Sequence, residues 1–460
     1  MKASKIRAGI RSLIVAGAMG LSAVSAHAET LTDALISAYQ ESGLLDQNRA
    51  LLRAADEDVA QAVATLRPVI GWTARATYSH DPVNLSGDHL TQSLGLSADL
   101  TVYDFGRNRL AIEAAKETVL ATREALVGIE QQVLLRAVEA FMNVRREAEF
   151  VSLRNNNVRL ITQELRAAQD RFEVGEVTRT DVSIAEARLA SARAGLAAAE
   201  GALAQAREEY KAAIGRYPGQ LASPPTPPQT ARSMSAAQGI AVQNHPDVRQ
   251  AQREVTVAEL NIRRAEANFL PNATLNGQTT VDQDGDANAT LSLNLGGPIY
   301  QGGQLKSLRR QSIARRDASR AALHLATLSV AQNVGNAWSS LIVARASIEA
   351  TDRQVRASRV AYRGVREEAT LGARTTLDVL DAEQELLDAQ ANRISAGVDA
   401  QIASYRLLAA MGHLTVRHLN LGIATYDPAD YYNAVRNAPT RPISEQGQRL
   451  DGVLERLNRN

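Results

Sequence analysis

Two stretches of the chain repeat one pattern, and this duplication limits the folds that the sequence can adopt. The segment from Val174 to Ala190, VGEVTRTDVSIAEARLA, recurs from Leu371 to Leu387 as LGARTTLDVLDAEQELL. The matched positions keep one offset (372 − 175 = 197), and they include Gly175 with Gly372, Thr178 with Thr375, Asp181 with Asp378 and Glu186 with Glu383. Each copy has a glycine at a turn and then a helical pattern, so we predict a tandem repeat of helical hairpins. One difference stands out, because Asp381 occupies the place that Ile184 has in the first copy.

Each hairpin is predicted to be very long, because apolar residues keep a spacing of three and four over many turns. In the first copy this heptad seam runs from Leu134 to Phe172. We expect one helix over 107–174, about 100 Å long at 1.5 Å per residue, and a return helix over 178–214. The offset of 197 holds from 300 to 412, so the second copy is predicted to match it in length.

Before each long helix, the period of the sequence changes to that of a β-strand. Apolar residues alternate with polar ones over 72–78 and 94–102, and again over 275–281 and 289–295. Strands of this length with one apolar face are typical of transmembrane barrels, although a hairpin half-buried on a core has the same pattern. Four strands are too few to close a barrel, so a place in the membrane requires several chains. A single helix is expected before each pair of strands, over 31–66 and 234–267.

The composition excludes several classes of function. The chain has 51 Lys and Arg against 50 Asp and Glu, a balance that does not favour nucleic-acid binding. It has no Cys, which excludes disulfides, thiol catalysis and a lipid-anchored N-terminal cysteine. The seven His lack metal-binding spacing, and no nucleophile–base set occurs. We therefore predict no catalytic residue, no bound metal and no cofactor.

The chain order gives five predicted segments. Basic residues, an apolar run over 13–24 and Ala26-His27-Ala28 predict a cleaved signal peptide over 1–28. The first repeat covers 29–220, a Pro-rich linker follows at 221–233, and the second repeat covers 234–420. Residues 421–460 are predicted to form a strap over the body and then a disordered tail.

The sequence resembles the TolC family of outer-membrane efflux and type I secretion channels. The resemblance covers nearly the whole chain after the signal peptide, and its strength lies in the order of several motifs. These are VYDFGRNR at 102–109, RFEVGEVTRTDV at 171–182, IYQGGQ at 299–304, LGARTTLDVLDA at 371–382 and YDPADYY at 426–432.

This resemblance implies a mainly α fold with a small β part, assembled as a homotrimer. Three protomers with four strands each would form one 12-stranded barrel in the lipid of the outer membrane. Their long hairpins would form an α-barrel in the periplasm. The assembly would be a passive exit duct that docks with a periplasmic adaptor and an inner-membrane pump of the RND or ABC class.

The resemblance also implies roles for the two turns. The turns would line the periplasmic mouth, where the adaptor docks, at Val174, Gly175 and Glu176 and at Leu371, Gly372 and Ala373. A glycine at each turn also suits a simple helix cap, and the two interpretations are compatible.

Asp378 and Asp381 match the aspartates that line the narrow part of the channel in the family. Their i, i+3 spacing places both on one face of a helix. In a trimer they would form two rings of carboxylates that favour cations, and we expect each ring to raise the pKa of its own members. The alternative is an acidic helix start that only complements the helix dipole.

Arg374 matches the arginine that ties neighbouring hairpins together at the closed mouth in the family. Its matching partners here are Thr180 and Asp181. A second lock position of the family is often Tyr, but this sequence has Ala369, so the mouth is expected to be held closed by fewer bonds or by different ones.

Two other classes of protein share part of this pattern. A periplasmic coiled-coil adaptor or scaffold would explain the helices but not the four alternating strands. A secreted enzyme would need a catalytic set, and the glycines at 296, 297, 302 and 303 lack the Lys-Ser/Thr of a phosphate loop.

Overall fold

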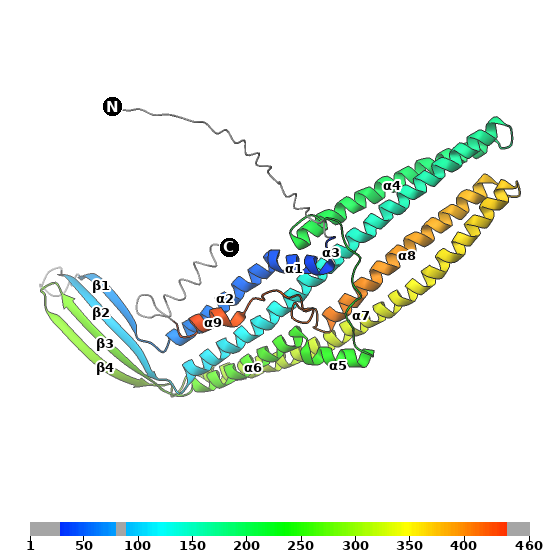
Figure 1. The fold of residues 1–460 in the computed structure, drawn as a ribbon. Helices are drawn as coiled ribbons and strands as arrows, with labels where there is room; N and C mark the ends of the chain where they lie inside the picture. The colour runs from blue at the N-terminus through cyan, green and yellow to red at the C-terminus, as the bar shows by residue number, and fades with distance from the viewer. Residues whose placement is uncertain (1–27, 80–88, 439–460) are drawn as a thin grey trace, which may run out of the picture.

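The computed structural model describes residues 28–79 and 89–438, which form an elongated molecule with a β-sheet at one end and two hairpin tips at the other (Figure 1). The predicted signal peptide, apart from residue 28, and the predicted disordered tail beyond 438 lie outside the described residues.

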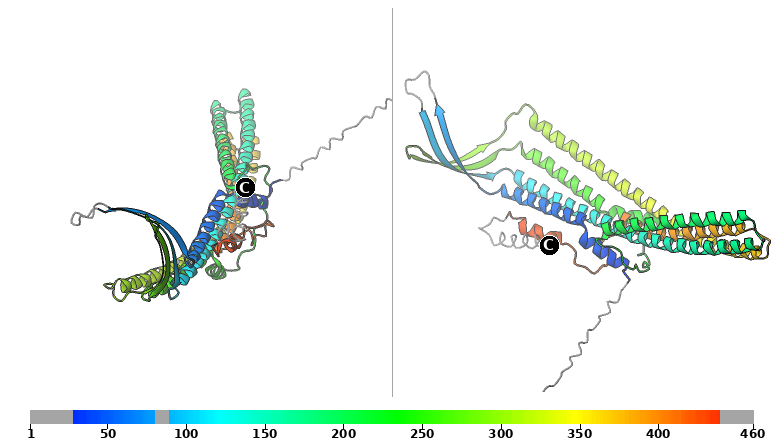
Figure 2. Two further views of the ribbon diagram at one scale, coloured as in Figure 1. Left: turned by 90° about the vertical axis from the view of Figure 1, so that its left-hand side faces the viewer. Right: turned by 90° about the horizontal axis from the view of Figure 1, so that it is seen from above.

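In the described chain the sheet has four antiparallel strands, which follow one another in chain order. They are β1 (Val69–Ser79), β2 (His89–Tyr103), β3 (Asn272–Asp282) and β4 (Ala287–Gly296). The pairing of β2 with β3 joins the two repeats in one sheet. Seen along the molecule, the strands form an arc rather than a flat layer (Figure 2).

The register of the sheet separates an apolar face from a polar one. Trp72 lies opposite Leu96, and Leu275 lies opposite Leu293, so the apolar residues of all four strands share a face. Trp72 is 72% exposed and Leu293 is 67% exposed, which shows that no other part of the described chain covers this face. On the other face, the Asn294 amide donates to Oδ1 of Asn276 at 2.8 Å. The predicted alternation of these strands is confirmed.

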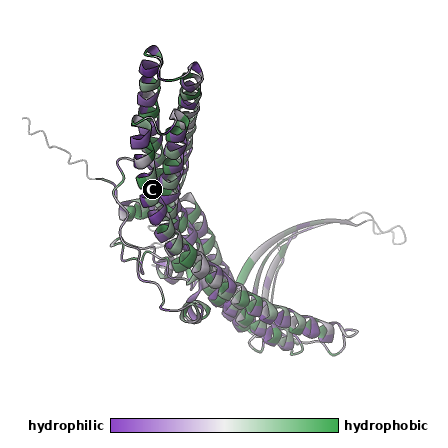
Figure 3. Cartoon of the chain, turned by 90° about the vertical axis from the view of Figure 1, so that its right-hand side faces the viewer, coloured by the Kyte–Doolittle hydropathy of each residue, from purple (hydrophilic) through white to green (hydrophobic). Residues whose placement is uncertain are grey.

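Four helices build the two long hairpins. They are α3 (Arg107–Glu173), α4 (Arg179–Ile214), α7 (Gln304–Thr370) and α8 (Thr376–Ala410). Both α3 and α7 have 67 residues, as the constant offset predicts. Hydrophilic and hydrophobic residues are interspersed along their whole length (Figure 3). Among the described residues, no helix combines the length and the apolar composition that are needed to cross a membrane.

The prediction of one helix before each pair of strands was wrong. The structure has α1 (Leu31–Glu41) and α2 (Gly43–Ala64) in the first repeat, and α5 (Met234–Asn244) and α6 (Pro246–Ala267) in the second. Ser42 separates the first pair and caps α2, since its hydroxyl accepts from the Leu45 amide at 3.3 Å. Pro246 begins α6, where its missing N–H costs nothing.

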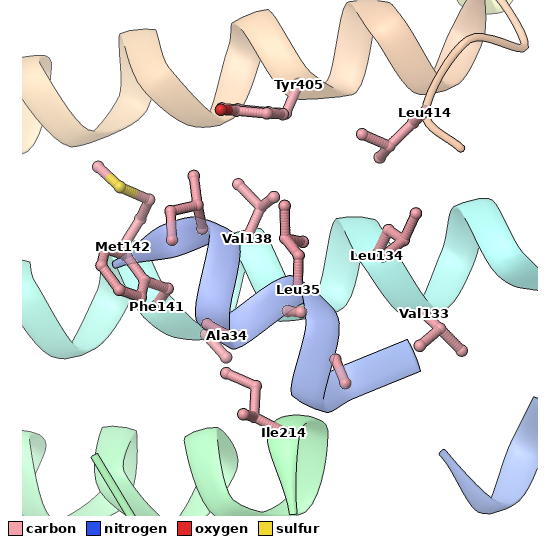
Figure 4. Close-up of a cluster of buried hydrophobic side chains, with 14 of the residues drawn as sticks. Ala34, Leu35, Val133, Leu134, Val138, Phe141, Met142, Ile214, Tyr405 and Leu414 are labelled. Carbon is pink, nitrogen blue, oxygen red and sulfur yellow. The ribbon is translucent and has the colours of Figure 1, made fainter. Parts of the chain in front are cut away.

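The main core lies where α1 meets the long helices. Its buried side chains come from α1, the start of α2, α3, α4, α8 and the segment after α8. Among them are Ala34, Leu35, Leu134, Val138 and Phe141 (Figure 4). A second cluster joins α5 to α7 and α8. Burial of these residues fixes the short helices to the middle of the molecule and leaves the hairpins to project beyond it.

The flanks of the long helices are covered unequally. Helix α6 packs against both α3 and α7, whereas α2 packs against α3 and against α9 (Pro428–Val435). In residues 421–438, which contain α9, the Tyr431 hydroxyl donates to Glu57 of α2 at 2.7 Å. The Arg123 guanidinium of α3 donates to the Pro428 carbonyl at 3.1 Å and lies over the Tyr432 ring.

Candidate functional site at the hairpin tips

The two turns have the same backbone geometry. Gly175 has φ 82° and Gly372 has φ 77°, a left-handed conformation that glycine adopts without steric cost. In the first turn the Glu176 amide donates to the Arg171 carbonyl at 2.9 Å, and in the second Ala373 donates to Glu368 at 2.9 Å. These bonds satisfy the last carbonyls of α3 and α7 as in a Schellman cap. The helix-cap interpretation of the glycines is therefore correct at both turns.

The tip residues are open to solvent. Val174 is 71% exposed and Leu371 is 85% exposed, although both are large apolar residues. One large apolar side chain at each turn is therefore accessible to another protein.

The repeated Thr-x-x-Asp pattern forms a capping box in each copy. Thr375 is the N-cap of α8, and its amide and hydroxyl donate to Oδ2 of Asp378 at 2.9 and 2.8 Å. Thr178 and Asp181 make the matching bonds at the start of α4. The capping box satisfies amides that a helix start leaves unpaired, which explains why both repeats keep these two residues.

The capping bonds lower the pKa of both carboxyls. The backbone and side-chain bonds from Thr375 hold the pKa of Asp378 below its usual value, and the side-chain and backbone bonds from Thr178 do the same for Asp181. These bonds act within one protomer, which contains no ring of like charges, so the rise expected from a ring in a trimer stays a prediction. Asp378 is thus ionised at neutral pH.

Asp381 takes part in a contact that joins the two hairpins. Its Oδ1 lies 2.5 Å from Nη2 of Arg188, which belongs to α4, while Asp381 belongs to α8. Arg188 was not among the predicted site residues, although the repeat contains a signal for it. The repeat counterpart of Arg188 is Glu385, and that of Asp381 is Ile184, so both partners differ from their counterparts in the other copy.

Arg374 has a partner in its own hairpin. Its Nε donates to Oε2 of Glu368 at 2.9 Å, and the bond and charge of Glu368 raise the pKa of the guanidinium. Arg374, Asp181 and Ala369 line one groove of about 710 Å³ between the tips, and Thr180 does not border it. In the part of the chain that the structure describes, Arg374 forms no hydrogen bond or ion pair with Thr180 or Asp181, and their pairing stays a prediction.

Further contacts between the hairpins lie above the tips. Arg406 of α8 pairs with Glu139 of α3 at 2.7 Å. The Asn157 amide of α3 donates to Glu383 of α8 at 3.0 Å, inside the protein. The described residues contain no group of three or more His, Asp or Glu side chains placed to hold a metal ion.

Comparison with known proteins relates this arrangement to one family. The family model described as outer membrane efflux protein matches residues 35–216 and 239–413. The outer membrane efflux protein BepC of Brucella suis biovar 1 is 35% identical over 428 residues, covering 91% of this chain and 92% of BepC. The alkaline protease secretion protein AprF of Pseudomonas aeruginosa is 25% identical over 361 residues, covering 74% of this chain and 73% of AprF. The solved structure of the outer membrane protein VceC of Vibrio cholerae superposes with a TM-score of 0.71 at 22% identity, covering 83% of this chain and 96% of VceC.

Proposed function

Because this chain belongs to the outer membrane efflux protein family and resides in the outer membrane as a TolC-type channel protein, we propose that three copies form one gated exit duct. The observation that carries this proposal is the sheet. Its apolar face is exposed, and among the described strands the outer edges of β1 and β4 are unpaired. Lipid does not tolerate such edges, so four strands need copies of themselves to close a barrel.

The repeat supports the same assembly in the helical part. We assign the repeats to 29–220 and 234–420, joined by the linker at 221–233. Within the protomer α6 lies between α3 and α7, which are repeat counterparts. Helix α2, the counterpart of α6, packs against one long helix, α3, among the described residues. In the proposed trimer α2 packs against α7 of the next copy, where Leu325 and Leu328 are exposed.

The mouth of the duct is the proposed gate. Asp378 and Asp381 face the pore and favour cations, and the low pKa of Asp378 keeps its negative charge at neutral pH. Arg374, Thr180 and Asp181 form the proposed network that holds the mouth closed, with Ala369 in the place of a second lock. The Arg188 pair with Asp381 adds a contact of the same kind.

The exposed tips are the proposed docking site for a periplasmic adaptor. They comprise Val174, Gly175 and Glu176 in the first turn and Leu371, Gly372 and Ala373 in the second. An adaptor there would connect the duct to an inner-membrane RND or ABC pump. The relatives support both uses, since BepC is named for efflux and AprF for secretion of a protease.

Reconstitution of the purified full-length protein tests the proposal. We expect a heat-resistant trimer on gels and small, cation-selective conductance steps in planar bilayers. A monomer that forms no pore, but binds a periplasmic adaptor, would instead support the alternative function as a scaffold.

A further inference from the structure

Glu383 lies buried between the two hairpins of the protomer. The residue is 4% exposed, and its Oε1 accepts the Asn157 amide at 3.0 Å. Its Oε2 is also buried, and so is the hydroxyl of Tyr362, and neither has a hydrogen-bond partner among the described residues. A carboxyl in such a place is costly to ionise, because only one of its oxygens has a donor.

The charged groups around Glu383 come from three other helices. Glu164 of α3 and Arg366 of α7 lie 3.8 Å apart and act on Glu383 with opposite sign. From α4, Arg188 reaches the same part of α8 but pairs with Asp381. Burial is the largest effect, and it raises the pKa of Glu383 to about 7, helped by Glu164 and opposed by the Asn157 bond.

We propose that Glu383 is a gating residue, whose protonated form holds the two hairpins of a protomer together and whose ionised form lets them separate. The inference rests on the proposed function as a gated duct. Glu383 lies two residues beyond Asp381 on α8 and, unlike Asp381, is buried. Through Glu383 the gate would respond to the periplasmic pH.

The raised pKa of Glu383 determines which protonation state stabilises the packed hairpins. A carboxyl whose pKa rises from 4.5 to about 7 on packing favours the packed state while it is protonated. That contribution is lost as the pH rises from 4.5 to about 7, and it stays lost above that. With a pKa of about 7, roughly nine tenths of the groups are protonated at pH 6 and roughly one tenth at pH 8.

Conductance of the trimer in planar bilayers as a function of pH tests the inference. For the wild type we expect conductance or open probability to rise at least about threefold between pH 6 and 8. Glu383→Gln keeps the shape and the Asn157 bond but cannot ionise, so its conductance should not change with pH and should stay at or below the wild-type level at pH 6. Glu385→Gln removes an exposed carboxylate two residues away and should keep the wild-type profile.

A second variant should shift the pH dependence of the conductance instead of abolishing it. Glu164→Gln takes away a carboxylate that raises the pKa of Glu383, so the midpoint should move to lower pH. A wild-type channel with no pH response over this range, or a Glu383→Gln channel with the wild-type response, overturns the inference but leaves the duct intact. A wild-type protein that forms no channel overturns the proposed function itself.

Discussion

Arg188 on α4 and Asp381 on α8 form an ion pair of 2.5 Å that ties the first helical hairpin to the second. Both side chains are partly exposed, so the pair is weak, in the range of about 0.2–1 kcal/mol. A weak tie suits a mouth that a partner protein must open, because the partner then needs to supply little free energy.

Removal of this tie should loosen the mouth. We expect Arg188→Ala to raise the single-channel conductance or the open probability by up to about fivefold, in line with a surface ion pair. Arg193→Ala changes an exposed arginine farther along α4 that has no ion pair among the described residues, and it should behave like wild type. Equal conductance of the two variants would show that the pair does not hold the gate.

The carboxylates of the mouth should control ion selectivity. Replacing both Asp378 and Asp381 with Ala is expected to weaken cation selectivity and to abolish block by divalent cations added from the periplasmic side. Asp378→Asn separates charge from capping, since an amide oxygen still accepts a bond from Thr375. Asp181→Asn makes the same change in the other repeat, and because Asp181 belongs to the proposed closing network, it should change the conductance but not the ion selectivity. Unchanged reversal potentials in the double variant would contradict the selectivity role.

The capping box at the start of α8 should stabilise the second tip locally. Thr375→Ala removes the hydroxyl that bonds Asp378, and we expect amide exchange in the first turn of α8 to become about fivefold faster. The pKa of Asp378 lies below 3.8, so this contribution is present at neutral pH and is lost as the pH falls through that lowered value. Exchange rates that match wild type at pH 7 would rule out the cap as a source of stability.

The repeat predicts a contact between protomers that mirrors one inside each protomer. Glu383 and Asn157 have the counterparts Glu186 and Gln354, which are exposed. In a trimer built on the repeat, Glu186 of one copy meets Gln354 of the next. Because the chain has no Cys, Glu186→Cys with Gln354→Cys should cross-link cleanly into dimers and trimers on denaturing gels.

The control for this experiment is the pair inside the protomer. Asn157→Cys with Glu383→Cys should cross-link without any increase in mass. If the first pair also gave only monomers, the proposed order of helices around the tube would be incorrect.

The buried carboxyl of Asp56 should make the stability of the middle of the molecule depend on pH. It is fully buried under residues 421–438, neither of its oxygens has a partner among the described residues, and burial raises its pKa to about 6. Stability from the protonated form is therefore lost as the pH rises from 3.8 to about 6. Asp56→Asn should melt at a higher temperature than wild type at pH 7.5 and at a similar temperature at pH 4.5. A lower melting temperature at pH 7.5 would argue that Arg123 fully compensates the buried charge.

Local sequence signals were sufficient for the long elements and insufficient for their mutual contacts. The bounds of α3, α4, α7 and α8 follow from glycine turns and from the repeat, because caps and periodicity act within a few residues. The break before Pro246 has a local signal, because proline favours the first turn of a helix, whereas the periodic pattern continues across it. The break at Ser42 carries a weaker signal, since serine is common inside helices as well as at their starts.

The contacts between hairpins depend on how two separate helices align. Nothing near Arg188 in the sequence specifies Asp381, and nothing near Glu383 specifies Asn157. For Asp378 the sequence is ambiguous instead of silent, because its position fits both a pore carboxylate and a capping residue. The hydrogen bonds of Thr375 establish the second role, whereas the first depends on neighbouring copies.

The sheet has a consequence for how the protein matures after export. The helical hairpins are amphipathic and capped, so they are compatible with water from the moment they form. The strands carry an exposed apolar face with Trp72 and Leu293, and nothing in residues 28–79 and 89–438 of a single protomer buries it. Such a surface favours aggregation in the aqueous periplasm. We therefore expect newly exported chains to depend on chaperones until the strands reach lipid, with the sheet as the last part of the fold to become stable.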